Sequence, residues 1–338
     1  MSQAYKSGLL SANHRSPDFE QLYVEVLAVL KKRLNVPEGY SLFFTSSATE
    51  CWEVIAQSLV QQQSHHIYNG AFGQKWFTYT QRLRPQATWQ PYDVQAPLPV
   101  DGLELPAGTE VLCVTQNETS NGTQVSNATL AALRAKHPEV LLAVDATSSM
   151  AGVKLRFDLA DVWYASVQKC FGLPAGMAVM LCSERAIERA EQIGANSHYN
   201  SLPFMVQNMR KYQTTHTPNV LNIYLLYRTQ KEARRIRAVD ASLKRRAAAF
   251  MAACQHLPGL QPLVKNEAVR SDTVLVFEGT PELVAQVIQQ AAQAGLVLGK
   301  GYGAHKTTTF RVANFPAVTD AEMNRLLQFL QQYFNTKP

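Results

Sequence analysis

The sequence lacks the cysteine spacing of a metal site or of a disulfide framework. Its five cysteines are an odd number, and no two of them form a CxxC pair. Such usage is typical of reduced thiols inside a cell. No apolar run reaches the roughly 20 residues that cross a membrane, and the first residues hold no apolar segment of signal-peptide length. We therefore expect a cytoplasmic protein with no disulfide, no metal and no membrane partner.

The chain also lacks a surface suited to nucleic acid. Its formal charge of +6 comes from 32 Lys and Arg against 26 Asp and Glu, scattered over 338 residues. One basic cluster runs from Arg228 to Arg246, but no aromatic side chains interleave with its charges as a base-stacking surface requires. We interpret this cluster as the solvated face of a long helix. The positive excess suits an enzyme with anionic ligands.

Length and patterning predict two domains. Hydrophobic residues make up 46% and charged residues 17% of the chain, which are globular values. Short apolar runs alternate with helical patterns from 41 to about 193, which predicts a mostly parallel sheet covered on both faces. A long helix is expected over about 220–255, followed by a small α+β unit. The predicted boundaries are an N-terminal arm at 1–16, a large domain at 17–240 and a small C-terminal domain at 241–338.

Two neighbouring predicted strands end in a carboxylate and an amine. Leu141–Val144 is wholly apolar, as in a strand buried on both faces, and Asp145 follows it at the end where open α/β sheets bind ligands. A second apolar run, Val162–Val167, leads to Lys169. This pair suits pyridoxal 5′-phosphate (PLP), because a lysine forms the Schiff base and a carboxylate keeps the pyridine nitrogen protonated. An ordinary strand end and a solvated lysine are the alternative reading.

Other turns could bind parts of such a cofactor. Ser46–Thr49 precedes a helix predicted over Glu50–Gln62, so it forms either an anion cradle for a phosphate or an ordinary N-cap. Phe72 lies between glycines after a strand, where it could stack on a flat ring or pack in the core. A strand predicted over Glu110–Thr115 runs into a polar loop that begins at Gln116.

Together these motifs resemble one enzyme family. The chain is similar over nearly its whole length to the class V branch of fold-type I PLP enzymes, and within it to the phosphoserine aminotransferases. This resemblance implies the α/β fold of type I, with a large, mostly parallel sheet of the seven-stranded type and a small C-terminal α+β domain. The matching motifs are Asp145 with Ser148-Ser149, Gln168-Lys169, Gly172–Gly176, and Asn117-Glu118-Thr119 with Gly122.

The resemblance also implies roles for individual residues. Lys169 would carry the cofactor and Asp145 would pair with its pyridine nitrogen, so these two are the expected catalytic residues. The other expected cofactor-binding residues are Ala48, Thr49, Phe72, Thr119, Gln168, His216 and Thr217. The expected substrate-binding residues are His14, Arg15, His305, Lys306 and Arg311. Of these, Arg311 would hold the α-carboxylate, and the two basic pairs would hold a phosphate or a distal carboxylate.

The implied reaction is transamination between small amino and keto acids. Phosphoserine and 2-oxoglutarate, in serine biosynthesis, are the first expectation. The implied assembly is a homodimer in which His216 and Thr217 complete the partner's site.

Several positions depart from the family pattern and leave alternatives open. The phosphate loop has Ser46-Ser47 where glycines are usual, and Lys306 replaces an arginine and loses its bidentate fork. His216 replaces an asparagine. A class V aminotransferase for alanine, serine or another small amino acid, with glyoxylate or pyruvate, is therefore the alternative. A desulfurase or lyase using Cys170, and a regulator or scaffold that binds PLP or no cofactor, are less favoured.

Overall fold

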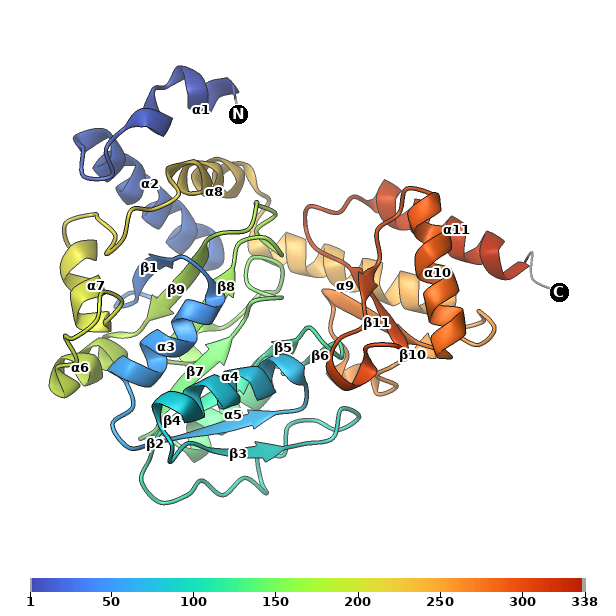
Figure 1. Ribbon diagram of the computed structural model, residues 1–338, viewed down its shortest axis with the longest axis horizontal. Coiled ribbons are helices and arrows are strands. Elements are labelled where there is room, and N and C mark those ends of the chain that lie inside the picture. Colours follow the sequence, from blue (N-terminus) through green and yellow to red (C-terminus); the bar gives the residue numbers. More distant parts are fainter. Residues whose placement is uncertain (1, 336–338) are drawn as a thin grey trace.

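The described residues form two main sheets flanked by helices, together with a small two-stranded sheet (Figure 1). This computed structural model describes residues 2–335, so Met1 of the predicted arm and 336–338 of the predicted small domain lie outside the described part. The larger sheet has seven strands and the smaller has four. The predicted α/β architecture with a second, smaller α+β unit is confirmed, whereas the residue boundaries of the two domains stay a prediction.

The seven-stranded sheet has the order β1-β9-β8-β7-β4-β2-β3. All its pairings are parallel except those of β9, which runs against both of its neighbours. The carboxyl ends of the other six strands therefore lie at one edge. The strands are β1 (Ser41–Thr45), β2 (Gln63–Tyr68), β3 (Thr88–Pro91), β4 (Thr109–Thr115), β7 (Leu141–Asp145), β8 (Val162–Ser166) and β9 (Ala178–Cys182).

Helices cover both faces of this sheet, as the alternating pattern predicts. One core packs the sheet against α2 (Pro17–Leu34), α5 (Asn127–Lys136) and α8 (Val220–Glu232). The other core packs it against α3 (Ala48–Ser58), α4 (Ala71–Leu83), α6 (Glu184–Ile193) and α7 (Leu202–Met209). The helix expected over Glu50–Gln62 thus begins and ends earlier, and β3, α4 and α7 have no counterpart among the predicted elements.

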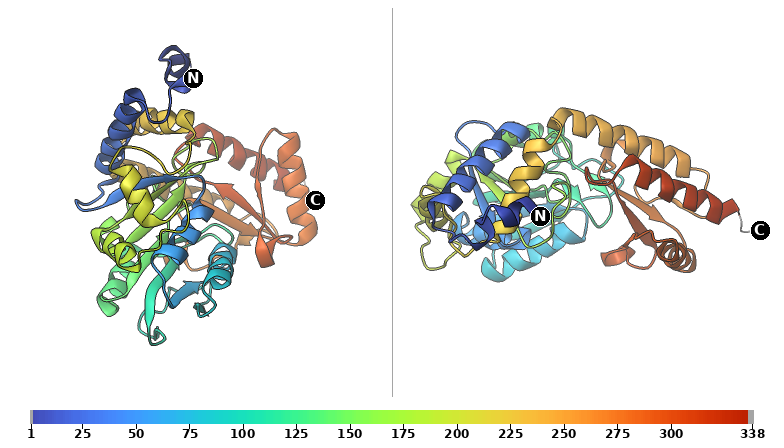
Figure 2. Two further views of the ribbon diagram at one scale, coloured as in Figure 1. Left: turned by 60° about the vertical axis from the view of Figure 1, so that its left-hand side comes forward. Right: turned by 90° about the horizontal axis from the view of Figure 1, so that it is seen from above.

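The single long helix predicted over 220–255 is wrong. The chain leaves α8 after Glu232, takes an extended conformation at Ala233 and begins α9 (Ile236–Cys254). The two helices pack against different partners: α8 lies along α2, and α9 lies along α11 (Asp320–Asn335), as Figure 2 shows from above. The break lets each helix bury its apolar face in its own core.

The smaller sheet is antiparallel, with the order β10-β11-β13-β12. Its core includes side chains of α9, α10 (Pro281–Gln293) and α11. The strands are β10 (Gln261–Pro262), β11 (Val274–Glu278), β12 (Gly299–Lys300) and β13 (Thr309–Ala313). The small α+β unit expected after the long helix therefore has an antiparallel sheet with β10 and β12 at its edges.

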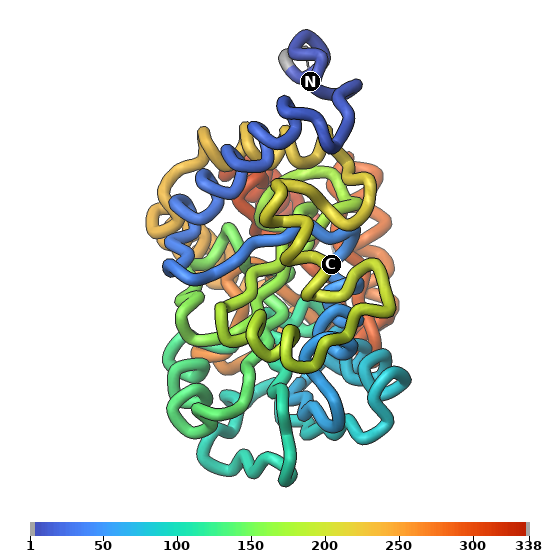
Figure 3. Tube along the Cα trace, turned by 90° about the vertical axis from the view of Figure 1, so that its left-hand side faces the viewer, coloured from blue at the N-terminus to red at the C-terminus, as the bar shows by residue number. Residues whose placement is uncertain are grey.

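Short elements complete the chain. The segment with α1 and η1 projects from the body of the molecule (Figure 3). None of the helices in the described part is long and apolar enough to cross a bilayer. The remaining elements are α1 (Ser2–Lys6), η1 (Leu9–Ser11), β5 (Asn117–Glu118), β6 (Thr123–Gln124), η2 (Phe157–Leu159), η3 (Glu267–Val269) and η4 (Gly303–His305).

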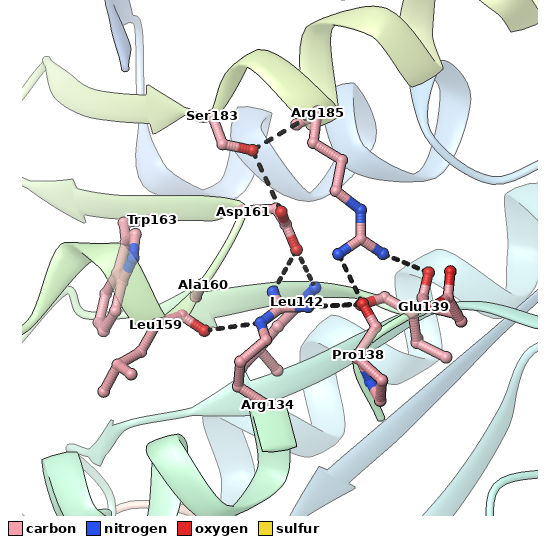
Figure 4. Close-up of polar contacts among 12 residues, drawn as sticks. Arg134, Pro138, Glu139, Leu142, Leu159, Ala160, Asp161, Trp163, Ser183 and Arg185 are labelled. Carbon is pink, nitrogen blue, oxygen red and sulfur yellow. Dashed lines mark hydrogen bonds and ion pairs between the residues drawn. The ribbon is translucent and has the colours of Figure 1, made fainter. Parts of the chain in front are cut away.

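A polar network fixes the ends of β7, β8 and β9 at the edge of the sheet opposite the carboxyl ends of the parallel strands (Figure 4). Asp161, just before β8, accepts hydrogen bonds from the Leu142 N–H of β7 at 2.8 Å and from the Ser183 hydroxyl after β9 at 3.2 Å. It also pairs with the guanidinium of Arg134 on α5. One buried carboxylate therefore ties three neighbouring strands and a covering helix together.

Candidate active site

Lys169 lies in a turn just beyond the carboxyl end of β8. The turn is closed by a hydrogen bond from the Gly172 N–H to the Lys169 carbonyl oxygen at 3.0 Å, and Gly172 takes a positive φ of 73°, which favours glycine. The lysine is half-buried, and its Nζ donates to Thr119 Oγ1 at 3.0 Å and to Ser148 Oγ at 2.9 Å. Burial lowers the pKa of this amine, although the charge of Asp145 opposes the shift. A lowered pKa favours the neutral, nucleophilic form.

Asp145 ends β7, the strand beside β8. The carboxylate is buried and accepts a hydrogen bond from the Thr147 N–H at 2.9 Å. Burial raises the pKa of this carboxyl, and the Thr147 hydrogen bonds and the charge of Lys169 partly offset the rise. A carboxylate removed from water gains stability from a cationic N–H donor, so Asp145 can hold a protonated ring nitrogen.

Glu118 fixes the segment that supports both Thr119 and Phe72. Its buried carboxylate accepts the N–H groups of Phe72 at 3.1 Å and Gly73 at 3.0 Å, in the first turn of α4. It also accepts the Ser120 N–H at 2.9 Å and hydroxyl at 2.7 Å. Burial raises the pKa of Glu118, and these donors oppose the rise. This carboxylate, whose role the sequence motif does not reveal, aligns two predicted cofactor contacts.

Phe72 lies in the first turn of α4 with its ring facing two other groups. The ring centroid is 5.4 Å from Lys169 Nζ. The same ring stacks on Tyr302, with centroids 4.9 Å apart and an interplanar angle of 11°. Tyr302 lies between β12 and η4, so this contact joins the loop after β12 to helix α4. Sequence reasoning misses Tyr302, because nothing local marks it.

The predicted anion cradle forms the N-terminus of α3. Ser47 caps the helix, and its hydroxyl accepts the Glu50 N–H at 3.1 Å. The Glu50 carboxylate turns back to accept the Ser46 N–H at 2.7 Å and hydroxyl at 2.6 Å. The first N–H groups of a helix have no intrahelical partner, so Ala48 and Thr49 can offer theirs to an anion.

Arg311 reaches the same region from β13. Its Nη1 donates to the Thr119 carbonyl oxygen at 3.2 Å and its Nε donates to the Lys300 carbonyl oxygen at 2.9 Å. Burial lowers the pKa of the half-buried guanidinium. The ion pairs found within residues 2–335 do not include Arg311. It is therefore available for a substrate carboxylate.

The structure brings some predicted residues together and leaves others apart. Lys169 and Thr119 hydrogen-bond each other, while Gln168 is exposed beside them. His216 and Thr217 lie in the loop before α8, and the buried Nδ1 of His216 has no hydrogen-bond partner among the described residues.

The two basic pairs lie in separate parts of the chain. His14 and Arg15 precede α2, beside the projecting N-terminal segment, and no hydrogen bond or ion pair in the described part joins them to Lys169. His305 ends η4 and lines a cavity of about 490 Å³ together with Tyr302, and Lys306 follows it, exposed to solvent.

These residues fit PLP. Lys169 offers a buried amine, Asp145 a desolvated carboxylate, and Phe72 a flat apolar ring. The start of α3 offers N–H groups for the phosphate. The arrangement can hold a planar, phosphorylated heterocycle between an acid and an amine.

Comparison with known proteins agrees with this chemistry. Residues 2–308 match the family described as aminotransferase class-V. A phosphoserine aminotransferase from Corynebacterium glutamicum is 27% identical over 336 residues, which cover 95% of this chain and 86% of that protein. One from Rhodococcus opacus is also 27% identical and covers 95% of this chain and 87% of that protein.

Solved structures give the same result. A phosphoserine aminotransferase from Cytophaga hutchinsonii has a TM-score of 0.92 at 30% identity, covering 98% of this chain and 93% of that one. The fold is also that of an aspartate aminotransferase from Thermus thermophilus, with a TM-score of 0.82 at 20% identity, covering 97% of this chain and 94% of that one.

Fold and site together define a PLP-dependent enzyme of fold type I. The chain belongs to the class-V aminotransferase family, and it is a transaminase that acts on amino and keto acids. The alternative of a regulator or scaffold is therefore excluded. The Cys170 thiol does not suit a desulfurase, because it is buried, donates to the Ser148 carbonyl oxygen at 3.2 Å and has its pKa raised to about 12 by burial.

Proposed function

We propose that this aminotransferase moves the amino group of phosphoserine to 2-oxoglutarate, as a step in serine biosynthesis. The observation that carries the proposal is the 30% identity and TM-score of 0.92 to a solved phosphoserine aminotransferase. Arg311 and the basic segment His305-Lys306 support it, because a donor with two anionic groups needs cations at both ends.

In this proposal each cofactor contact has one task. Lys169 binds the cofactor covalently, Asp145 holds its ring nitrogen protonated, and Phe72 and Thr119 hold the ring. The start of α3 would hold the phosphate, with Ala48 and Thr49 donating their N–H groups and Gln168 donating from its amide.

The reaction then depends on where protons are held. PLP supplies an electron sink for the bond that breaks at the substrate Cα. Lys169 Nζ takes the Cα proton, and its buried setting with a lowered pKa suits it to act as a base. Arg311 grips the α-carboxylate and so orients the Cα–H bond. Arg15, His305 and Lys306 hold the phosphate of one substrate or the distal carboxylate of the other.

We also propose a homodimer in the cytoplasm. His216 and Thr217 would contact the cofactor phosphate of the partner subunit. The unpartnered Nδ1 of His216 supports this assignment, since a buried polar atom normally has a hydrogen-bond partner. Arg15 would likewise act on the partner's substrate, and within residues 2–335 no hydrogen bond or ion pair joins it to Lys169.

A panel of amino donors tests the proposed substrate. Purified holoenzyme is supplied with 2-oxoglutarate and with phosphoserine, serine, alanine or aspartate, and kcat/KM is compared. We expect phosphoserine to exceed serine by at least about 100-fold, because serine lacks the phosphate and so forgoes its charge-assisted contacts with the basic residues. Equal or better turnover of serine or alanine contradicts the proposal.

One observation favours a second candidate, a transaminase for alanine or serine with glyoxylate or pyruvate. Lys306 stands where an arginine is usual, so the phosphate loses a bidentate partner, and Arg15 lies outside the Lys169 cluster. The same donor panel, repeated with glyoxylate and pyruvate as acceptors, distinguishes the two candidates.

A further inference from the structure

Two stacked aromatic rings beside Lys169 lie close to three cationic side chains. The ring centroids of Phe72, from α4, and Tyr302, from the loop after β12, lie 4.9 Å apart, and the two rings are nearly parallel. Lys169 Nζ lies 5.4 Å from the Phe72 centroid, whereas Lys75 Nζ and the Arg311 guanidinium carbon lie 5.3 Å and 6.0 Å from the Tyr302 centroid. The Tyr302 ring therefore lies close to two cations, Lys75 from α4 and Arg311 from β13.

These cations have no carboxylate partner. Among residues 2–335, no ion pair includes Lys75, Lys169 or Arg311. The carboxylates whose charges act on Lys169 are Asp145 and Glu118, and the Glu118 oxygens already accept backbone N–H groups. Lys75 and Arg311 therefore have no ion-pair partner among the described residues, and an anionic ligand can supply their counter-charge. Lys306, in the same segment as Tyr302, adds a further positive charge.

Lys75 and Tyr302 present donors on the same side of α4 as Phe72. Lys75 follows Phe72 by three positions, a spacing that puts both side chains on one helix face. Its Nζ donates to the Tyr302 hydroxyl at 2.6 Å. The ammonium keeps two further N–H donors, and the hydroxyl, having accepted this bond, keeps its own hydrogen to donate.

We propose that Lys75 and Tyr302 form a subsite for the second anionic group of the amino-acid substrate, a phosphate or a side-chain carboxylate. Arg311, over the same tyrosine ring, holds the α-carboxylate. Lys75 and Tyr302 thus act together with His305 and Lys306, which the proposed function assigns to the same anion, and strengthen the preference for donors with two anions over donors with one. This inference rests on the proposed function in that the substrate carries a distal anion, but it does not require that anion to be a phosphate.

Four variants of the holoenzyme test the subsite. Lys75→Met removes the charge, Lys75→Arg keeps it, and Tyr302→Phe keeps the stacked ring while removing the hydroxyl. Lys231→Met is the matched control, because Lys231 donates in the same way to the Tyr227 hydroxyl at 2.7 Å, on the surface of α8. Lys75 is exposed, so its replacement leaves the fold intact.

The readout is the ratio of kcat/KM for two-anion donors (phosphoserine, glutamate, aspartate) to that for alanine. We expect Lys75→Met to lower this ratio about 10- to 100-fold, chiefly through KM, since one charge-assisted contact is lost. Tyr302→Phe should lower it less, and Lys75→Arg should restore most of it. Lys231→Met should leave it unchanged.

A binding measurement tests the subsite independently of the chemical step. Titration calorimetry of the holoenzyme with glutarate, a dicarboxylate without an amine, and with inorganic phosphate should give weaker binding for Lys75→Met than for wild type. An unchanged affinity for both probes, together with an unchanged donor ratio, overturns the subsite.

The two proposals fail separately. If glutamate or aspartate is preferred over phosphoserine and Lys75→Met still lowers the ratio, the subsite stands and the phosphoserine proposal falls. If phosphoserine is preferred and Lys75→Met leaves the donor ratio unchanged, the proposed function stands and the subsite falls. If wild type favours alanine and Lys75→Met leaves the donor ratio unchanged, both the proposed function and the subsite fall.

Discussion

The Nζ of Lys169 donates a hydrogen bond to the Ser148 hydroxyl at 2.9 Å, and Ser148 in turn lies beside Thr119 Oγ1, the second partner of the amine. The lysine is therefore held by two neutral hydroxyl groups rather than by a carboxylate. Such partners orient an amine without fixing its charge, which suits a residue that must alternate between protonated and free base.

Replacement of Lys169 should abolish covalent cofactor binding. Lys169→Ala is expected to lose the visible absorbance band of the holoenzyme and at least about 1,000-fold of its transaminase rate, since the bond-forming amine and the base are both removed. Borohydride treatment followed by peptide mass spectrometry should label position 169 in wild type and in Lys231→Ala, but not in Lys169→Ala. A label on another lysine would disprove the assignment.

Asp145→Asn should separate stability from function. Because burial raises the pKa of Asp145, the folded state favours its protonated form, so the stability that the carboxyl contributes is present at low pH and is lost as pH rises through the folded pKa. The cofactor-free Asn variant should therefore melt roughly 2 °C or more above wild type at pH 7, with the gap closing towards about pH 4.

The same variant should be a poor enzyme. An amide cannot hold the ring nitrogen protonated, and a loss of about 100-fold in kcat is expected. Asp158→Asn, at an exposed ion pair with Arg156, serves as the control for both measurements and should change neither. A cofactor-free Asp145→Asn protein that melts below wild type at pH 7 would contradict the burial argument.

Glu118 should matter for cofactor affinity as well as for the fold. Glu118→Ala leaves the N–H groups of Phe72, Gly73 and Ser120 without their acceptor and should cost about 2–4 kcal/mol of unfolding free energy. Glu118→Gln keeps one acceptor oxygen and should recover part of both stability and affinity. Thermal unfolding and the dissociation constant of PLP are the measurements, and equal PLP affinity in all three proteins would show that Glu118 does not align the site.

Mixed subunits should show whether His216 acts across an interface. Lys169→Ala and the double variant His216→Ala/Thr217→Ala are each expected to be impaired alone. If His216 serves the partner's site, a hybrid dimer contains one site with both an intact Lys169 and intact His216 and Thr217, so mixing and refolding the two should restore up to about a quarter of wild-type activity, given that half of the dimers are hybrids with one good site each. Activity no greater than the sum of the two separate variants would place His216 in its own subunit's site, and sedimentation as a 37.6 kDa species would exclude the dimer itself.

The sequence predicts best what depends on strongly patterned strands. Leu141–Asp145 and Val162–Ser166 are buried along their whole length, so their apolar runs identify them, and their ends put Asp145 and Lys169 at one edge of the sheet. The family resemblance adds Thr119 and Arg311, which the structure places in hydrogen-bond contact with each other.

Local sequence patterns do not predict features that depend on tertiary packing. The break between α8 and α9 contains neither glycine nor proline and exists because the two helices pack in different cores. Tyr302 and Phe72 lie 230 positions apart in the chain and meet only because the small sheet packs near α4. Lys75 alone leaves a local sign, its three-residue spacing from Phe72.

The Asp161 network has a consequence for how this enzyme can change. It anchors β7, β8 and α5 at the end of the sheet remote from Asp145 and Lys169, and so the polar contacts that hold the scaffold in register are not the ones that meet the substrate. Loops at the chemical end can accumulate substitutions, such as the serines at Ser46-Ser47, while the far end keeps the strands aligned. New donor preferences can thus evolve, or be engineered, on an unaltered frame.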